Sequence, residues 1–346
     1  MDTYAFQDKL RNLLAWFLDV RSGLLDNEGE HRPWELADHI ACDYRNLKVS
    51  SDNTERVVKA VQPISHEYFE EDRDYRLPIK KLYELVNGEL SEYLTHFYLH
   101  GSLATGDYKK GWSDLDTLMI VKKEAVTDPR KLLELRKFCF AAWPLFLQIT
   151  PLQHHGFIVV TEFDLVSYTS RLLPPSVLDT ALALKEGRSE LELSLRKDHS
   201  SSYELLEHRL MIARDAVETG IFKYHPKDGV YLLSGFRNAE NAMYQLFSFL
   251  GNVMIAPAYF LDALGRGCYK KQSFDIARPY FSKKAWSLVK KATQIRALWP
   301  EKEGLAYRGN AVPQWVREIL DKNYFEECLF LWEEAVTKAK NFTRDE

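Results

Sequence analysis

Residues 97–102 read Phe97-Tyr98-Leu99-His100-Gly101-Ser102, and residues 113–116 read Ser113-Asp114-Leu115-Asp116 before an apolar run over 118–121. The first stretch is an apolar strand that ends in two small residues, where backbone N–H groups can hold an anion. In the second, Asp114 and Asp116 are two positions apart, so a strand turns both carboxylates to one side. Paired carboxylates are ligands that Mg²⁺ accepts, with substrate phosphates completing its shell. The two stretches therefore predict a metal-dependent site that handles phosphate.

This combination resembles the DNA polymerase β-type nucleotidyltransferase superfamily. Its members carry an apolar strand ending in Gly-Ser, a short helix and loop, and then Asp-x-Asp entering a second strand. The matching positions are Gly101, Ser102, Asp114 and Asp116, and the resemblance covers residues 93–170. It implies that Asp114 and Asp116 hold one or two Mg²⁺ ions. It also implies that Ser102 binds the phosphates of a nucleoside triphosphate, with ATP expected, while Gly101 lets the backbone come close.

A third carboxylate is normally present in this superfamily, and the sequence does not identify which residue takes its place here. Residues 151–157, Pro-Leu-Gln-His-His-Gly-Phe, stand at the expected place and offer imidazoles instead of an acid. Glu162 and Asp164 follow and share one face of a regular strand. Asp164 and His155 are therefore comparable candidates for the third catalytic residue. His154 and His155 would point to opposite faces of a strand, so joint binding of one metal ion is not expected.

The C-terminal half offers further polar residues. In the superfamily, a helical domain often closes over the nucleotide and supplies basic residues, which makes Lys270 and Lys271 candidates for phosphate binding. The alternative is a solvated lysine pair at a helix start. Arg237, Asn241 and Tyr244 share a helix face; they line a pocket or, more simply, form the outer surface.

The fold class expected is α+β: a small mixed β-sheet with flanking helices, followed by an α-helical bundle. Three regions are predicted: a helical N-terminal region packed on the catalytic module (1–92), the nucleotidyltransferase module (93–175) and a helical domain (176–346). Within them, hydrophobic periodicity predicts helices over about 34–48, 54–70, 74–94 and 128–142, and further helices from about 203 onward. Strands are predicted over about 94–100, 114–122, 145–149, 157–161 and 164–168.

The amino-acid composition and net charge indicate which class of acceptor the protein is expected to use. The chain has 346 residues, 46% of them hydrophobic, and a formal charge of −4. This charge disfavours a general nucleic-acid coat, because such binding needs an excess of Lys and Arg. A small molecule or a protein is therefore the favoured acceptor, ahead of long nucleic acid.

The spacing of the cysteines and the lengths of the apolar segments indicate the cellular compartment. The four cysteines are widely spaced and show no zinc or disulfide pattern, which favours a reducing compartment. No signal segment and no stretch of about 18 apolar residues is recognised, so a cytoplasmic protein with no membrane partner is expected.

The expected activity is Mg²⁺-dependent transfer of a nucleoside monophosphate, AMP from ATP, onto a hydroxyl of a small molecule, a protein or an RNA end. If no third acid reaches the site, the alternative is a catalytically degenerate nucleotide-binding sensor or scaffold.

Overall fold

The computed structural model describes residues 3–20, 32–70, 75–150, 153, 155–170, 172–187, 190–197, 200–220, 222–224, 232–234, 242–303 and 312–342. The chain divides into two compact units. The first comprises Met1–Tyr108, Ser113–Thr169 and Leu178–Lys197, and the second comprises Lys109–Trp112, Ser170–Val177 and Asp198–Glu346. Residues 178–197 thus belong with the first unit, beyond the limit at 175 that the sequence suggests, because residues 182–183 pair with its central sheet and residues 190–196 pair with residues 54–60 of the same unit.

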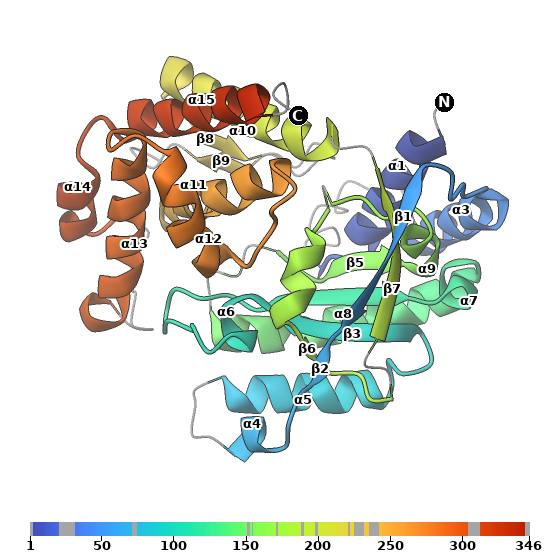
Figure 1. Ribbon diagram of the computed structural model, residues 1–346. Helices are drawn as coiled ribbons and strands as arrows, with labels where there is room; N and C mark the ends of the chain where they lie inside the picture. The colour runs from blue at the N-terminus through green and yellow to red at the C-terminus, as the bar shows by residue number, and fades with distance from the viewer. Residues whose placement is uncertain are drawn as a thin grey trace. The chain divides into compact units, whose positions relative to one another are not determined.

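The first unit is built on a five-stranded mixed sheet in the order β2-β6-β3-β4-β5 (Figure 1). Its strands are β2 (Gln62–Pro63), β6 (Leu182–Ala183), β3 (Leu94–His100), β4 (Asp116–Val121) and β5 (Ile158–Thr161). β3 and β4 are antiparallel neighbours, and β4 and β5 are parallel. All of β3 and all of β4 after Asp116 are buried, as expected for apolar runs at the centre of a covered sheet.

Helices flank this sheet. They are α1 (Thr3–Leu18), α3 (Pro33–Asn46), α4 (Glu67–Glu70), α5 (Arg76–Asn87), α6 (Gly101–Ala104), α7 (Lys123–Val126), α8 (Pro129–Ile149) and α9 (Glu162–Leu165). The 3₁₀ helix η2 (Pro175–Thr180) contains the boundary between the two units. The long helices and the sheet share one hydrophobic core, whose buried members include Leu14, Phe17, Ile40, Phe97 and Phe146. This arrangement and the helical region that follows it confirm the predicted α+β class.

Three predicted elements are wrong. Residues 54–70 are not one helix but β1 (Thr54–Ala60), β2 and α4; β1 pairs antiparallel with β7 (Glu190–Arg196) in a separate two-stranded ladder (Figure 1). That partner lies far along the chain, so local periodicity does not reveal it. Residues 145–149 are the last turns of α8, since a short apolar run alone does not separate helix from strand. Residues 164–168 start inside α9, because Thr161 forms a capping box with Asp164.

The second unit is mainly helical. It contains α10 (Ser200–Thr219), the hairpin strands β8 (Phe222–Tyr224) and β9 (Leu232–Ser234), α11 (Ala242–Ala263), α12 (Lys270–Ala277), η3 (Arg278–Tyr280), α13 (Ala285–Lys302), α14 (Gln314–Leu320) and α15 (Tyr324–Phe342). Its core holds an aromatic group in which the Trp112 ring centroid lies 4.4 Å from that of Phe247 and 5.5 Å from that of Trp299. The structure does not test the predicted polar helix face, because Arg237, Asn241 and the Tyr244 side chain lie outside the described residues.

One helix of the second unit is unusually apolar. By length and composition, the window Leu246–Ala263 of α11 could cross a membrane, but 56% of it is buried inside the protein. Core helices pass the same test, so this helix is weak grounds for a membrane span.

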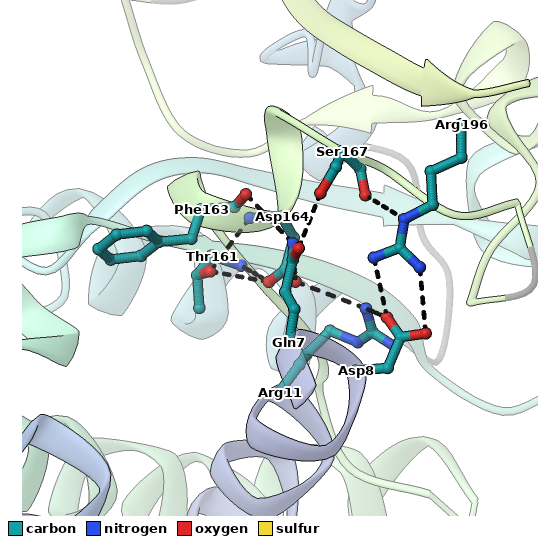
Figure 2. A network of polar contacts seen from close by, with 8 residues as sticks. All are labelled: Gln7, Asp8, Arg11, Thr161, Phe163, Asp164, Ser167 and Arg196. Atoms are coloured by element: carbon teal, nitrogen blue, oxygen red, sulfur yellow. Dashed lines mark hydrogen bonds and ion pairs between the residues drawn. The ribbon is translucent and has the colours of Figure 1, made fainter. Parts of the chain in front are cut away.

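A buried polar network connects α1 to the sheet of the first unit (Figure 2). Asp164, 2% exposed, accepts hydrogen bonds from the Thr161 backbone N–H (2.8 Å) and hydroxyl (2.7 Å). Its other oxygen accepts from Gln7 Nε2 at 3.2 Å and lies 3.5 Å from Arg11 Nη1. Arg11 also pairs with Asp8, at 3.0 Å. Both α1 and the end of β5 therefore depend on one buried carboxylate.

We expect Asp164→Ala to lower the free energy of unfolding by about 3–5 kcal/mol, because Gln7 Nε2 and the Thr161 cap lose their buried acceptor and the buried Arg11 guanidinium keeps only Asp8. Urea denaturation measures this loss. The control is Glu134→Ala, which breaks the exposed Lys137–Glu134 pair and should cost less than about 1 kcal/mol. Equal losses in the two variants would show that the network does not hold α1 in place.

Candidate active site

Three side chains of the first unit converge on one point. His155 Nε2 lies 3.3 Å from Asp114 Oδ2 and 3.2 Å from Asp116 Oδ1. One ligand atom from each of the three residues lies within 4.8 Å of the other two. Each side chain keeps about a quarter of its surface exposed, with values of 27% for His155, 23% for Asp114 and 24% for Asp116. We call these residues the Asp-Asp-His cluster, and its two carboxylates and imidazole fit a divalent metal ion.

The sheet topology explains why these residues meet. Asp116 opens β4 and Asp114 stands just before it, while the intervening Leu115 is fully buried. The expected alternation therefore turns both carboxylates one way and Leu115 into the core. His155 stands before β5, which runs parallel to β4 with Leu118 opposite Ile158. Residues that precede two parallel neighbouring strands lie at the same edge of a sheet.

Gly101 lies directly against this cluster. Its φ is +67°, and a Cβ atom there would overlap Asp116 Oδ2 and come within 2.9 Å of Asp116 Cγ. The contact follows from the β3–β4 ladder, in which His100 stands opposite Asp116. Ser102 follows Gly101 in α6, and its carbonyl accepts the Asp107 N–H at 2.9 Å, which shapes the turn. The small-residue turn and the acidic pair are thus adjacent, and phosphate binding by Ser102 stays a prediction.

Gln153 is a residue whose role sequence reasoning missed. Its side chain is 5% exposed and pairs with both backbone groups of Leu115: the Leu115 N–H donates to Oε1 (3.0 Å), and Nε2 donates to the Leu115 carbonyl (3.2 Å). Nε2 also donates to the His155 carbonyl at 2.8 Å. One amide therefore ties the segment between the two acids to the segment that carries the imidazole. No local signal marks such a role, because Leu115 is 38 positions away.

The pKa values of the two histidines at the site are shifted in opposite directions. Burial acts to lower the pKa of His155, but its hydrogen bonds to Asp114 and Asp116 outweigh that effect and raise the pKa well above its usual range. For His100, burial lowers the pKa despite the nearby charge of Asp116. His100 is 6% exposed, and its Nε2 has no hydrogen-bond partner within the part of the chain that the structure describes. An imidazole with a lowered pKa and with Nε2 unpaired among the described residues thus lies beside the cluster.

The structure brings His155, and not Asp164, to the two acids. Asp164 follows the last residue of β5, Thr161, which stands opposite Val121 at the far end of β4. It belongs to the network that anchors α1. His154 lies outside the described residues.

The two candidate lysines belong to the second unit. Lys270 and Lys271 begin α12 there, the first partly buried and the second exposed. Their contact with phosphate stays a prediction.

We expect Gly101→Ala to weaken Mn²⁺ binding, measured by isothermal titration calorimetry, by at least about tenfold, because the new methyl group must displace Asp116. The matched control is Gly106→Ala. Gly106 has nearly the same φ, +69°, but nothing lies within 4 Å of its Cβ position. Both variants carry the same backbone strain, so a similar loss in both would exclude the Asp116 contact as the cause.

We expect Gln153→Leu, which keeps the side chain's approximate size, to weaken Mn²⁺ binding by about 10–100-fold, the usual range for residues that orient metal ligands. Both backbone groups of Leu115 lose their partners in this variant, so the carboxylates on either side lose their fixed orientation. The same titration measures the effect, with a circular dichroism spectrum as the check on folding. A folded variant with unchanged affinity would contradict the role given to Gln153.

Comparison with known proteins agrees with this geometry. Residues 79–146 match the family model described as a nucleotidyltransferase domain, a range that includes Gly101, Ser102, Asp114 and Asp116 but ends before His155. No curated protein matches the chain. At residues 79–146 the chain therefore contains a nucleotidyltransferase domain of the DNA polymerase β-like type, with Asp114 and Asp116 as its candidate acidic group.

Proposed function

We propose that the protein is a divalent-metal-dependent nucleotidyltransferase that moves a nucleoside monophosphate, AMP from ATP, onto a hydroxyl group. One observation carries this proposal: Gly101, in the turn expected to hold phosphate, abuts Asp116, which shares a metal-binding cluster with Asp114 and His155. Phosphate donors and metal ligands must be this close, because the ion of such sites is held by protein carboxylates and substrate phosphates together.

In the proposed reaction, the oxygen of the acceptor hydroxyl forms a bond to the α-phosphorus. The bond between that phosphorus and the oxygen bridging to the β-phosphate breaks, pyrophosphate leaves and the hydroxyl proton passes to solvent water. Little covalent work falls to the protein, so positioning and charge neutralisation supply most of the catalysis. A divalent ion held by these residues, Mg²⁺ by the superfamily resemblance, would neutralise phosphate charge and make the hydroxyl more acidic.

The residues of this chain then have separate tasks. Asp114, Asp116 and His155 hold the ion, and the Gln153 side chain connects their two backbone segments by hydrogen bonds. Gly101 and Ser102 orient the phosphates through the backbone and the hydroxyl. Phosphate binding by Lys270 and Lys271 is part of the proposal through the superfamily resemblance alone, and the net charge of −4 favours a small-molecule or protein acceptor over long nucleic acid. The widely spaced cysteines favour a cytoplasmic location.

The double variant Asp114→Asn with Asp116→Asn should abolish pyrophosphate release from ATP, because the ion loses both carboxylate ligands. The assay incubates the protein with Mg²⁺ and each α-³²P-labelled triphosphate, and follows pyrophosphate together with label transfer to the protein itself, to lysate proteins and to RNA. Asp179→Asn is the control, since Asp179 is an exposed aspartate of the same unit, paired with Lys59. It should keep the full rate.

The same assay tests the alternative. If the wild-type protein binds a triphosphate but releases no pyrophosphate with any acceptor preparation, in Mg²⁺ or in Mn²⁺, the protein is a nucleotide-binding sensor or scaffold. The presence of an imidazole in place of the third acid is the observation that favours this second function.

A further inference from the structure

The third ligand of the cluster is a nitrogen atom, and this chemistry determines which ion the site prefers. We propose that the Asp-Asp-His cluster selects a first-row transition-metal ion, with Mn²⁺ as the test case, over Mg²⁺, and that His155 Nε2 is a direct ligand. The proposal deepens the proposed function and rests on the same site.

The preference follows from the donor set. Mg²⁺ is a hard ion that takes oxygen ligands and gives up its water reluctantly, whereas imidazole suits first-row transition metals such as iron, nickel, copper and zinc. Mn²⁺ has the lowest affinity of that series and also accepts oxygen ligands, so a preference for Mn²⁺ over Mg²⁺ is the most stringent test of the imidazole ligand. An imidazole in place of a third carboxylate also removes one negative charge from the site. That loss weakens binding of Mg²⁺, which is mainly electrostatic, more than binding of an ion that gains from the nitrogen lone pair. A site with His155 should therefore discriminate between the two ions more strongly than a site with three carboxylates.

The ring of His155 is oriented for this role. Its Nδ1 lies 3.0 Å from the Gly156 carbonyl oxygen, which can only accept, so Nδ1 carries a proton. Without an ion, Nε2 donates its proton toward the Asp114 and Asp116 carboxylates, and a divalent ion that displaces this proton gains the Nε2 lone pair. Histidines that bind metals typically donate their other ring N–H to a carbonyl or carboxylate in this way. The Gln153 amide, through its bond to the His155 carbonyl, holds the same segment in place.

A second imidazole supports the assignment independently. His100 stands opposite Asp116 in the antiparallel β3–β4 ladder, and directly opposed residues project their side chains from the same face of a sheet. Its Nε2 is buried and has no hydrogen-bond partner among the described residues, although buried ring nitrogens normally have one. A water molecule bound to a metal ion in the cluster would satisfy that nitrogen, with His155 as the nitrogen ligand of the ion. The surroundings of Asp116 are thus richer in nitrogen than an oxygen-only Mg²⁺ site requires.

The experiment measures metal binding without nucleotide. Isothermal titration gives the dissociation constants for Mn²⁺ alone and Mg²⁺ alone, and pulsed electron paramagnetic resonance of bound Mn²⁺ detects coupling to a directly bound ¹⁴N nucleus. The variants are His155→Asp, which restores a carboxylate, and His155→Gln, in case the first does not fold. The control is His39→Gln, which removes an imidazole that is 65% exposed on α3 of the same unit.

In the wild-type protein and in His39→Gln, we expect ¹⁴N coupling and tighter binding of Mn²⁺ than of Mg²⁺. In His155→Asp the coupling should disappear, and the preference for Mn²⁺ should fall by at least about tenfold. Bound Mn²⁺ without nitrogen coupling, coupling that survives both His155 variants, or an unchanged preference would overturn the proposal. Pyrophosphate release tests the proposed function separately. If the protein releases pyrophosphate but its bound ion shows no nitrogen ligand, the proposed function holds and this proposal fails. If Mn²⁺ is bound by nitrogen but no pyrophosphate is released, this proposal holds and the proposed function fails.

Discussion

The antiparallel pairing of β3 with β4 is the constraint on which the site depends. It sets His100 opposite Asp116, so the next residue, Gly101, is pressed against the Asp116 carboxylate at a distance that admits no side chain. Both strands are buried along almost their whole length, and a shift of register would move apolar residues out of the core. The hydrophobic core therefore holds the Gly101-Ser102 turn and the Asp114/Asp116 pair together.

A second constraint acts across the sheet, between β4 and β5. Parallel pairing puts the segment before β5 beside the segment before β4, and the buried Gln153 amide connects them through Leu115 and His155. Such an amide replaces the ladder hydrogen bonds that neither segment can make beyond the end of its strand. The cluster is thus built on strand ends and braced by a side chain, an arrangement more rigid than a loop.

Two acids of the first unit show how position assigns a role. Asp116 keeps about a quarter of its surface exposed and faces other metal-type ligands. Asp164 is almost fully buried, and its two carboxylate oxygens accept hydrogen bonds from Thr161 and Gln7 and pair with Arg11. A carboxylate with these partners stabilises the fold, because its desolvation is compensated within the protein, and it has little capacity left for an ion.

The sequence by itself determined the α+β class, the strands at 94–100 and 157–161 and the Gly101-Ser102 and Asp114-x-Asp116 motifs, since each depends on neighbours within a few residues. It also narrowed the third residue to His155 or Asp164. Only the tertiary structure separated these two, because they flank β5 and lie at opposite ends of its pairing with β4. The β1–β7 ladder and the Gln153 clamp were likewise decided by partners distant in sequence, and no local pattern encodes the free energy of a contact between residues that only folding brings together.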